Sequence, residues 1–211
     1  GDHGRLLSVT VRRSVSNGPW DEIARVRYTY YGGSEQPGSF GDLKAVIVQH
    51  RSGNGWMDGD THYYRYYRAG ESHGFAHGLK YVLLPHAFAS LAADPEVSDH
   101  YTASDTKVAQ YACNYFQYDL LRRVVREVLD GGVREYTYTY ANSYELSTST
   151  SSTSMEDYNR WVTKTVETRP DGARNTVYTN SLGLVLAKDL RLGDDRWIEY
   201  YRYGDNAEVV L

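Results

Sequence analysis

Residues 116–140 read FQYDLLRRVVREVLDGGVREYTYTY, and this stretch decides the fold. An aromatic segment ending in Tyr118-Asp119 is followed by an apolar segment, a glycine pair and a tyrosine-rich segment. In the last of these, Tyr136, Tyr138 and Tyr140 share one face, because side chains alternate between the two faces of a strand. Asp130-Gly131-Gly132 supplies the positive φ angles that a tight turn needs. The stretch therefore predicts half-buried antiparallel strands joined by short turns.

The same alternation occurs in two other places. In IARVRYTYY, residues 23–31, apolar and aromatic side chains alternate with arginine and threonine, and RWVTKTVET, residues 160–168, alternates in the same way. Turn signals separate the segments, and they include Gly32-Gly33, Gly53-Asn54-Gly55, Asp58-Gly59, Asp171-Gly172 and Gly193-Asp194-Asp195. We therefore expect an all-β fold built from a chain of antiparallel hairpins.

Two segments interrupt this rhythm. Residues 84–97, LPHAFASLAADPEV, group Phe88 and Leu91 at helical spacing and stop at Asp94-Pro95, because proline cannot continue a helix. This predicts one short helix near 86–93, within an insertion that spans 85–106. Residues 143–158 form a Ser/Thr-rich run without periodicity, which we expect to be a long loop. Outside these insertions, residues 1–211 are expected to form a single β-sheet region.

The composition narrows the choice of partners. Tyrosine occurs 21 times while phenylalanine occurs 4 times, which favours shallow sheet faces whose rings are packed but whose hydroxyls stay accessible. The net charge of −4 comes without a basic stripe, so a nucleic acid partner is not expected. Cys113 is the single cysteine, which excludes an internal disulfide. No run approaches the roughly 20 apolar residues that span a bilayer, so no membrane span is expected.

One unit recurs along the chain, and repeats of this kind decide a fold more reliably than any local motif. It consists of an aromatic residue, any residue, tyrosine, a small or acidic turn, and then an apolar strand. The repeat positions are Tyr28, Tyr30, Tyr64, Tyr66, Phe116, Tyr118, Asp119, Tyr138, Tyr140, Tyr178, Tyr201 and Tyr203. They mark equivalent positions in successive hairpin units of a repeated sheet.

This pattern resembles the YD repeat of the RHS family, whose consensus is Tyr-x-Tyr-Asp, a turn with Gly-Arg, an apolar strand, Gly and another strand. The resemblance covers nearly the whole chain outside 85–106 and 143–158. Only Tyr118-Asp119 keeps the Tyr-Asp pair, and only Gly4-Arg5 keeps the Gly-Arg pair.

In that family the repeats form a long sheet that spirals into a strip or closes into a hollow shell, in bacterial toxin components and in cell-surface teneurins. The resemblance implies an extended, curved or spiralling sheet within a longer secreted or cell-surface protein. The partners would be neighbouring repeats of the same parent chain and an encapsulated cargo domain. The role would be structural, without catalysis or a cofactor.

The residues that suggest chemistry have simpler explanations. His73 and His77 have the spacing of a helical metal site, but Gly74 and Gly78 argue against a helix there. Asp58 and Asp60 could offer oxygen ligands to calcium, yet the glutamate that completes a calcium loop is absent, which favours a hairpin turn. Carboxylate pairs such as Asp194-Asp195 and Glu156-Asp157 fit ordinary turns. No catalytic or metal-binding residue is therefore predicted.

Aromatic side chains leave a second function open. Trp20, Trp56, Trp161 and Trp197 recur near strand starts, where they would cover sheet faces between repeats. Flat apolar rings also stack on sugars. The alternative prediction is therefore a surface module that recognises a glycan or a protein, with candidate stacking residues Trp56, Tyr64, Trp197 and Tyr201.

Overall fold

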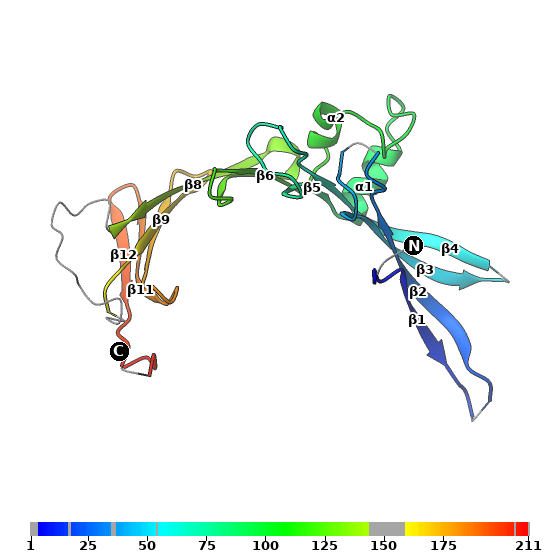
Figure 1. The fold of residues 1–211 in the computed structure, drawn as a ribbon, viewed down its shortest axis with the longest axis horizontal. Coiled ribbons are helices and arrows are strands. Elements are labelled where there is room, and N and C mark those ends of the chain that lie inside the picture. The colour runs from blue at the N-terminus through cyan, green and yellow to red at the C-terminus, as the bar shows by residue number, and fades with distance from the viewer. Residues whose placement is uncertain are drawn as a thin grey trace. The chain divides into compact units, whose positions relative to one another are not determined.

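The structure is a computed structural model that describes residues 4–16, 18–34, 37–53, 55–143, 159–204 and 206–210. The chain forms two compact units, Gly1–Val133 and Arg134–Leu211. The all-β prediction is confirmed: the described residues form twelve strands and two short α-helices (Figure 1). Within each unit, strands that follow one another in the chain pair antiparallel. In the described part of the chain, no helix is long and apolar enough to cross a membrane.

The first unit is a meander of seven strands that contains both helices. Its strands are β1 (Ser8–Arg13), β2 (Asp21–Tyr30), β3 (Leu43–Ser52), β4 (Gly55–Tyr66), β5 (Leu79–Leu83), β6 (Asn114–Tyr118) and β7 (Val124–Leu129). The turn predicted at 130–132 is confirmed as a single 3₁₀ turn, η1 (Asp130–Gly132), with positive φ at all three residues.

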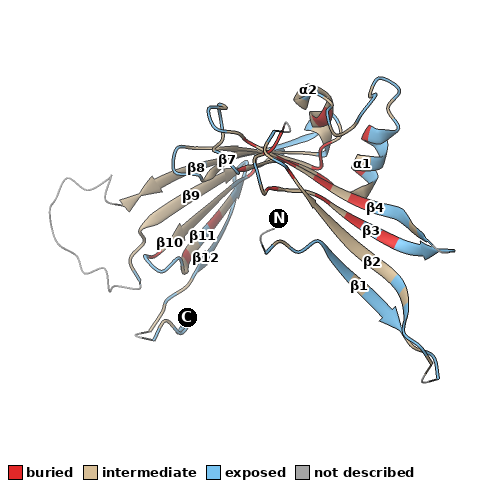
Figure 2. Ribbon diagram, turned by 45° about the vertical axis from the view of Figure 1, so that its right-hand side comes forward, coloured by how far each residue is buried: buried red, intermediate tan, exposed pale blue. Residues whose placement is uncertain are grey.

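The core of this unit lies on one face of β3, β4 and β5. Alternate residues of these strands are buried, as the red bands in Figure 2 show. Helix α1 (Pro85–Ala92) covers the buried residues of β4 and β5 with Ala87 and Leu91. The helix predicted near 86–93 is therefore confirmed. Among the strand residues that it helps to cover are Tyr63, Tyr81 and Leu83.

A second helix, α2 (Asp105–Ala109), was not predicted. It is five residues long, too short to show a helical period. The signal that could have identified it is its cap: the Ser104 hydroxyl accepts the Lys107 backbone N–H at 3.3 Å, and Asp105 lies in the first turn. Val108 of this helix is buried in the same hydrophobic cluster as Ala87 and Leu91 of α1.

The turn predicted at Asp58-Gly59 is wrong. Both residues lie inside β4, where the pairing with β3 shifts by one residue between Ile47 and Gln49. A shift of this kind is a β-bulge, which uses the same small residues as a turn. A Cβ at Gly59 would lie 3.2 Å from the Val48 carbonyl oxygen, so the strands approach closely there.

The second unit is a meander of five strands. They are β8 (Arg134–Asn142), β9 (Thr163–Thr168), β10 (Arg174–Thr179), β11 (Val185–Leu192) and β12 (Asp195–Tyr200). The predicted turn at Asp171-Gly172 joins β9 to β10, and Gly193 with φ 58° joins β11 to β12. Most side chains here are half-buried or exposed (Figure 2). Of the loop predicted at 143–158, residues 144–158 lie outside the described residues.

Candidate ligand-binding face

The tyrosines at repeat positions make a recurring contact. The Tyr30 hydroxyl, at the end of β2, donates to the Leu6 carbonyl just before β1, at 2.9 Å. The Tyr118 hydroxyl, at the end of β6, donates to the Leu79 carbonyl at the start of β5, at 2.9 Å. The Tyr203 hydroxyl, just after β12, donates to the Val185 carbonyl at the start of β11, at 2.9 Å. In three pairs of consecutive strands, β1–β2, β5–β6 and β11–β12, a tyrosine thus links the end of the second strand to the region where the first begins.

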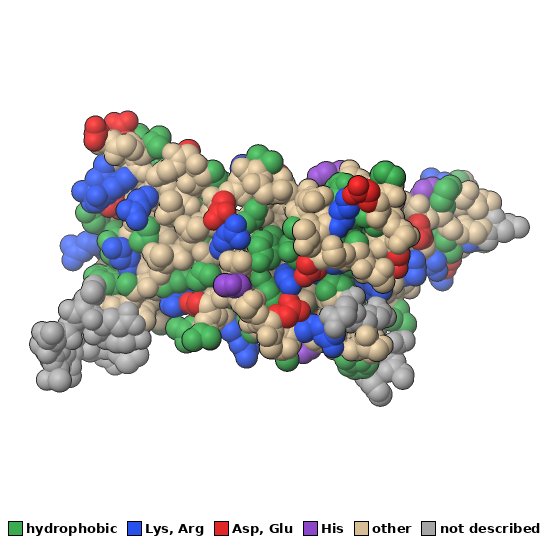
Figure 3. All heavy atoms as spheres, turned by 90° about the horizontal axis from the view of Figure 1, so that it is seen from above, with side chains coloured by type: hydrophobic (Ala, Val, Ile, Leu, Met, Phe, Trp, Pro, Cys, Tyr) green, Lys and Arg blue, Asp and Glu red, His purple; other side chains and the backbone are tan. Residues whose placement is uncertain are grey.

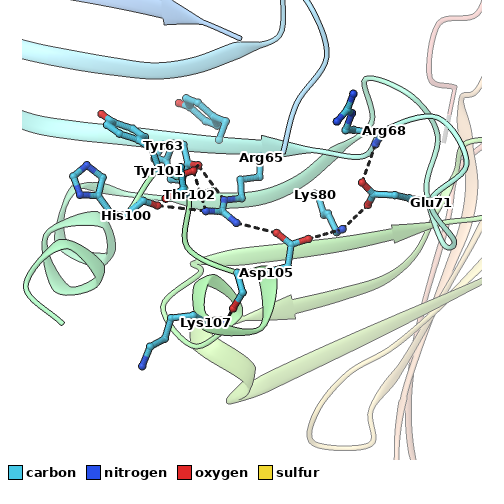
Figure 4. A network of polar contacts seen from close by, with 12 residues as sticks. Tyr63, Arg65, Arg68, Glu71, Lys80, His100, Tyr101, Thr102, Asp105 and Lys107 are labelled. Carbon is cyan, nitrogen blue, oxygen red and sulfur yellow. Dashed lines mark hydrogen bonds and ion pairs between the residues drawn. The ribbon is translucent and has the colours of Figure 1, made fainter. Parts of the chain in front are cut away.

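A polar network in the first unit surrounds a buried arginine (Figure 4). The Arg65 side chain is 1% exposed. Its Nε donates to the Tyr63 hydroxyl at 3.0 Å, and one terminal nitrogen bonds Asp105 at 2.9 Å. Its other terminal nitrogen donates to the carbonyls of His100 and Tyr101, at 3.3 and 3.5 Å.

Lys80 extends this network towards the surface. Its Nζ lies 2.6 Å from Asp105 and 2.5 Å from Glu71 (Figure 4). Burial alone would lower the pKa of Lys80, but hydrogen bonds to Asp105 and Glu71 outweigh it and raise that pKa. Because the Arg65 side chain donates its hydrogen bonds to groups of the protein itself, the network is suited to hold the 85–106 insertion on the sheet rather than to bind a ligand.

The residues with possible metal or catalytic roles lie in ordinary contacts. His77 and Asp42 form a pair, with 2.7 Å between Nδ1 and Oδ1, and the buried Cys113 thiol accepts the Leu84 backbone N–H at 3.4 Å. Asp58 accepts a hydrogen bond from the Gln49 side chain. Within the described ranges, no group of three or more His, Cys, Asp and Glu residues could hold a metal ion.

The predicted stacking residues do not form one site. Trp56 and Tyr64 belong to β4. The guanidinium groups of Arg25 and Arg51 lie over the Trp56 ring, with their central carbons 4.6 and 5.5 Å from its centroid. Trp197 lies on β12 and is 53% exposed. The Tyr201 hydroxyl bonds Glu199 at 2.8 Å, so its tip points to the side of β12 that Trp197 and Glu199 share.

Other residues gather on the opposite side of the same strands, and of the four predicted stacking residues Tyr201 also lines the hollow there. A hollow of about 600 Å³ lies there. Its lining includes the rings of Trp161, Tyr178 and Tyr200, together with Asp189, Arg196 and Arg202. A smaller hollow of about 240 Å³ shares Tyr178 and Asp189 with it and adds Lys164, Arg174 and Arg191. We call these nine residues the arginine–aromatic face.

Asp189 is the anchor of this face. It is 7% exposed. Arg196 bonds both of its carboxylate oxygens, at 2.8 and 2.9 Å, and Arg191 approaches it to 3.0 Å. These hydrogen bonds, from Arg196 first and then Arg191, hold the pKa of Asp189 well below its usual range. In Figure 3, basic side chains gather with hydrophobic ones at the left of the view, over the strands of the second unit.

Sequence reasoning found only part of this arrangement. Trp161 was named among the tryptophans and Tyr178 among the repeat positions, but Tyr200 and the arginines were not singled out. The missing information is the pairing of β10, β11 and β12, which brings together residues that are far apart in the chain.

No family model fits the chain, and no curated protein resembles it significantly. The resemblance to the RHS family therefore depends on the repeat positions alone and stays a prediction.

Proposed function

We propose that this chain is a structural segment of a larger hairpin-repeat protein of the RHS type, secreted or exposed at the cell surface, with no catalysis of its own. The observation that carries the proposal is the repeated tyrosine link. Tyr30, Tyr118 and Tyr203 each donate to a carbonyl at the beginning of the preceding strand. A contact that recurs in three strand pairs along the chain is what a sheet of equivalent units predicts.

The strands β1 and β12 support the same proposal. Each pairs with a single strand in the described part of the chain. Val9 and Val11 on β1 are 45% and 51% exposed. An edge with free backbone groups and apolar side chains accepts a further strand readily. In the proposed parent protein, neighbouring repeats cover these edges, and the finished sheet encloses a cargo domain.

The test is self-association of the isolated chain, measured by sedimentation velocity over a range of concentrations. We expect association through the edges, and Val9→Lys should suppress it because a lysine on an edge strand blocks strand addition. Val48→Lys is the matched control, since Val48 is 39% exposed on β3, which has a strand on both sides. A chain that stays monomeric, or that both variants affect equally, would contradict the proposal.

A second candidate function is recognition of a ligand at the surface. The arginine–aromatic face favours it, because ligand sites of about 300–1,000 Å³ lined by rings with a few polar groups are common in proteins. This function is compatible with the first, since a repeat sheet can carry a binding site on its outer face.

A further inference from the structure

The arginine–aromatic face is ordered in rows across the strands. Arg174 on β10 is the register partner of Arg191 on β11, which is the partner of Arg196 on β12. Two residues along, the row is Thr176, Asp189 and Ile198. Two residues further, the row is Tyr178, Ala187 and Tyr200, and Lys164 on β9 continues it. A row of arginines thus lies about 13 Å from a row of rings.

The charges on this face are unbalanced. Lys164, Arg174, Arg191, Arg196 and Arg202 are five cations, and Asp189 is the one carboxylate among the nine residues. Neither Arg174 nor Arg202 has a side-chain hydrogen bond or ion pair with the described part of the chain. The chain as a whole carries a net charge of −4, so this concentration of positive charge is local.

Like charges placed directly across two strands destabilise a sheet. Here three arginines lie side by side, and Asp189 neutralises only one of them. The side chains of Arg191 and Arg196 are still 55% and 49% exposed, so their remaining N–H groups are accessible to solvent. A bound anion would offset the repulsion, and guanidinium groups match carboxylates in geometry.

The rings complete the site. Tyr200 is 71% exposed, so one flat face is open to a ligand. Trp161 and Tyr178 meet edge to face, with centroids 5.6 Å apart and an angle of 77° between the rings. That geometry offers single ring faces, which suit the C–H face of a sugar. It offers no ladder of parallel rings of the kind that stacks successive bases of a single-stranded nucleic acid.

We propose that the arginine–aromatic face binds an acidic oligosaccharide, one whose sugars carry carboxylates, with the sugar rings on Tyr178 and Tyr200 and the carboxylates on the arginine row. The inference rests on the second candidate function, surface recognition, and names its ligand class. Along the strands, cations lie on both sides of the ring row, with Arg202 beyond Tyr200 and the arginine row on the other side. Within the ring row, Lys164 Nζ lies 5.8 Å from the centroid of the Tyr178 ring. A chain of sugars with regularly spaced carboxylates fits this alternation along the strands.

The experiment is calorimetric titration of the full chain with tetragalacturonate, and with its methyl ester as a neutral ligand of the same shape. We expect binding of the acid and at least about tenfold weaker binding of the ester, because charged hydrogen bonds to the arginines are lost. Tyr200→Ala and Arg174→Gln should each weaken binding about tenfold. Trp197→Ala and Lys188→Gln are the matched controls, since these residues lie on the other face of β12 and β11, and they should leave the affinity unchanged.

The outcomes separate the ligand class from the function. Equal affinity for the acid and the ester overturns the acidic class while recognition of sugars stands. Tighter binding of a single-stranded oligonucleotide of equal charge, lost on Tyr200→Ala, also overturns it. If Trp197→Ala also removes binding, the ligand lies on the opposite face of β12 and the proposal is overturned. If the chain binds none of these ligands although its circular dichroism shows that it is folded, both the acidic ligand class and the recognition function are overturned.

Discussion

Removing one tyrosine hydroxyl tests the structural role of the repeat positions. In Tyr118→Phe the ring is kept, and so are its edge-to-face contacts with Tyr67 and Phe75, at 6.1 and 5.1 Å between centroids. What is lost is the 2.9 Å hydrogen bond to the Leu79 carbonyl. A neutral hydrogen bond of this kind contributes about 1 kcal/mol net. Leu79 is half-buried, so water can reach part of the freed carbonyl and keeps the cost near that value.

The assay is urea unfolding, combined with native-state amide exchange of β5 and β6, because the two units need not unfold together. We expect Tyr118→Phe to lower the free energy of unfolding of the first unit by about 1 kcal/mol. Tyr64→Phe is the matched control, since Tyr64 is a half-buried tyrosine of the same unit whose hydroxyl makes no hydrogen bond with the described residues. Equal effects of the two substitutions would refute the proposed role of the hydroxyl.

Three further predictions concern the first unit. Asp105→Ala leaves the buried Arg65 without its carboxylate and should cost about 3 kcal/mol in urea unfolding, whereas Glu22→Ala, which breaks the exposed pair with Arg12, should cost under about 1 kcal/mol. A Cβ at Gly74 would overlap the Tyr67 ring, so Gly74→Ala should cost about 1–3 kcal/mol, while Gly55→Ala, whose added Cβ meets nothing closer than 3.9 Å, should have little effect. Burial raises the pKa of Tyr31, Tyr67 and Tyr81 well above 10. Their phenols stay neutral in the folded state while the unfolded chain ionises, so stability is present below about pH 10 and is lost as pH rises beyond it. The last tyrosinates to form should therefore appear together with the loss of circular dichroism, and ionisation of all the tyrosines with circular dichroism unchanged would contradict this.

The strands and the first helix could be predicted because their signals are local. The alternation over 133–140 needs no knowledge of the partner strand, and the spacing of Phe88 and Leu91 before Asp94-Pro95 is enough to indicate a helix near 86–93. Helix α2 was not predicted because five residues are too few to show the helical spacing of apolar side chains. Asp58-Gly59 was misassigned because turns and bulges use the same residues, and only the pairing with β3 distinguishes them.

The candidate site was less predictable for a physical reason. Its members are neighbours across strands, and the register that joins Arg174 to Arg191 and Arg196 is set by turn lengths and by a bulge between Tyr178 and Thr179. A shift of one residue would have moved every arginine to the other face. The sequence contains the residues but not the register.

Amide exchange at β1 tests the central claim, that the sheet is built to be extended by a neighbouring strand. The Tyr28 backbone N–H donates to the Leu7 carbonyl, and because hydrogen-bonded pairs alternate in an antiparallel ladder, the N–H groups of Ser8 and Thr10 point away from β2. We expect these two amides to exchange freely in the dilute chain and to become protected as it associates, while the Val9 amide is protected throughout. Association that leaves the Ser8 and Thr10 amides unprotected would contradict the claim.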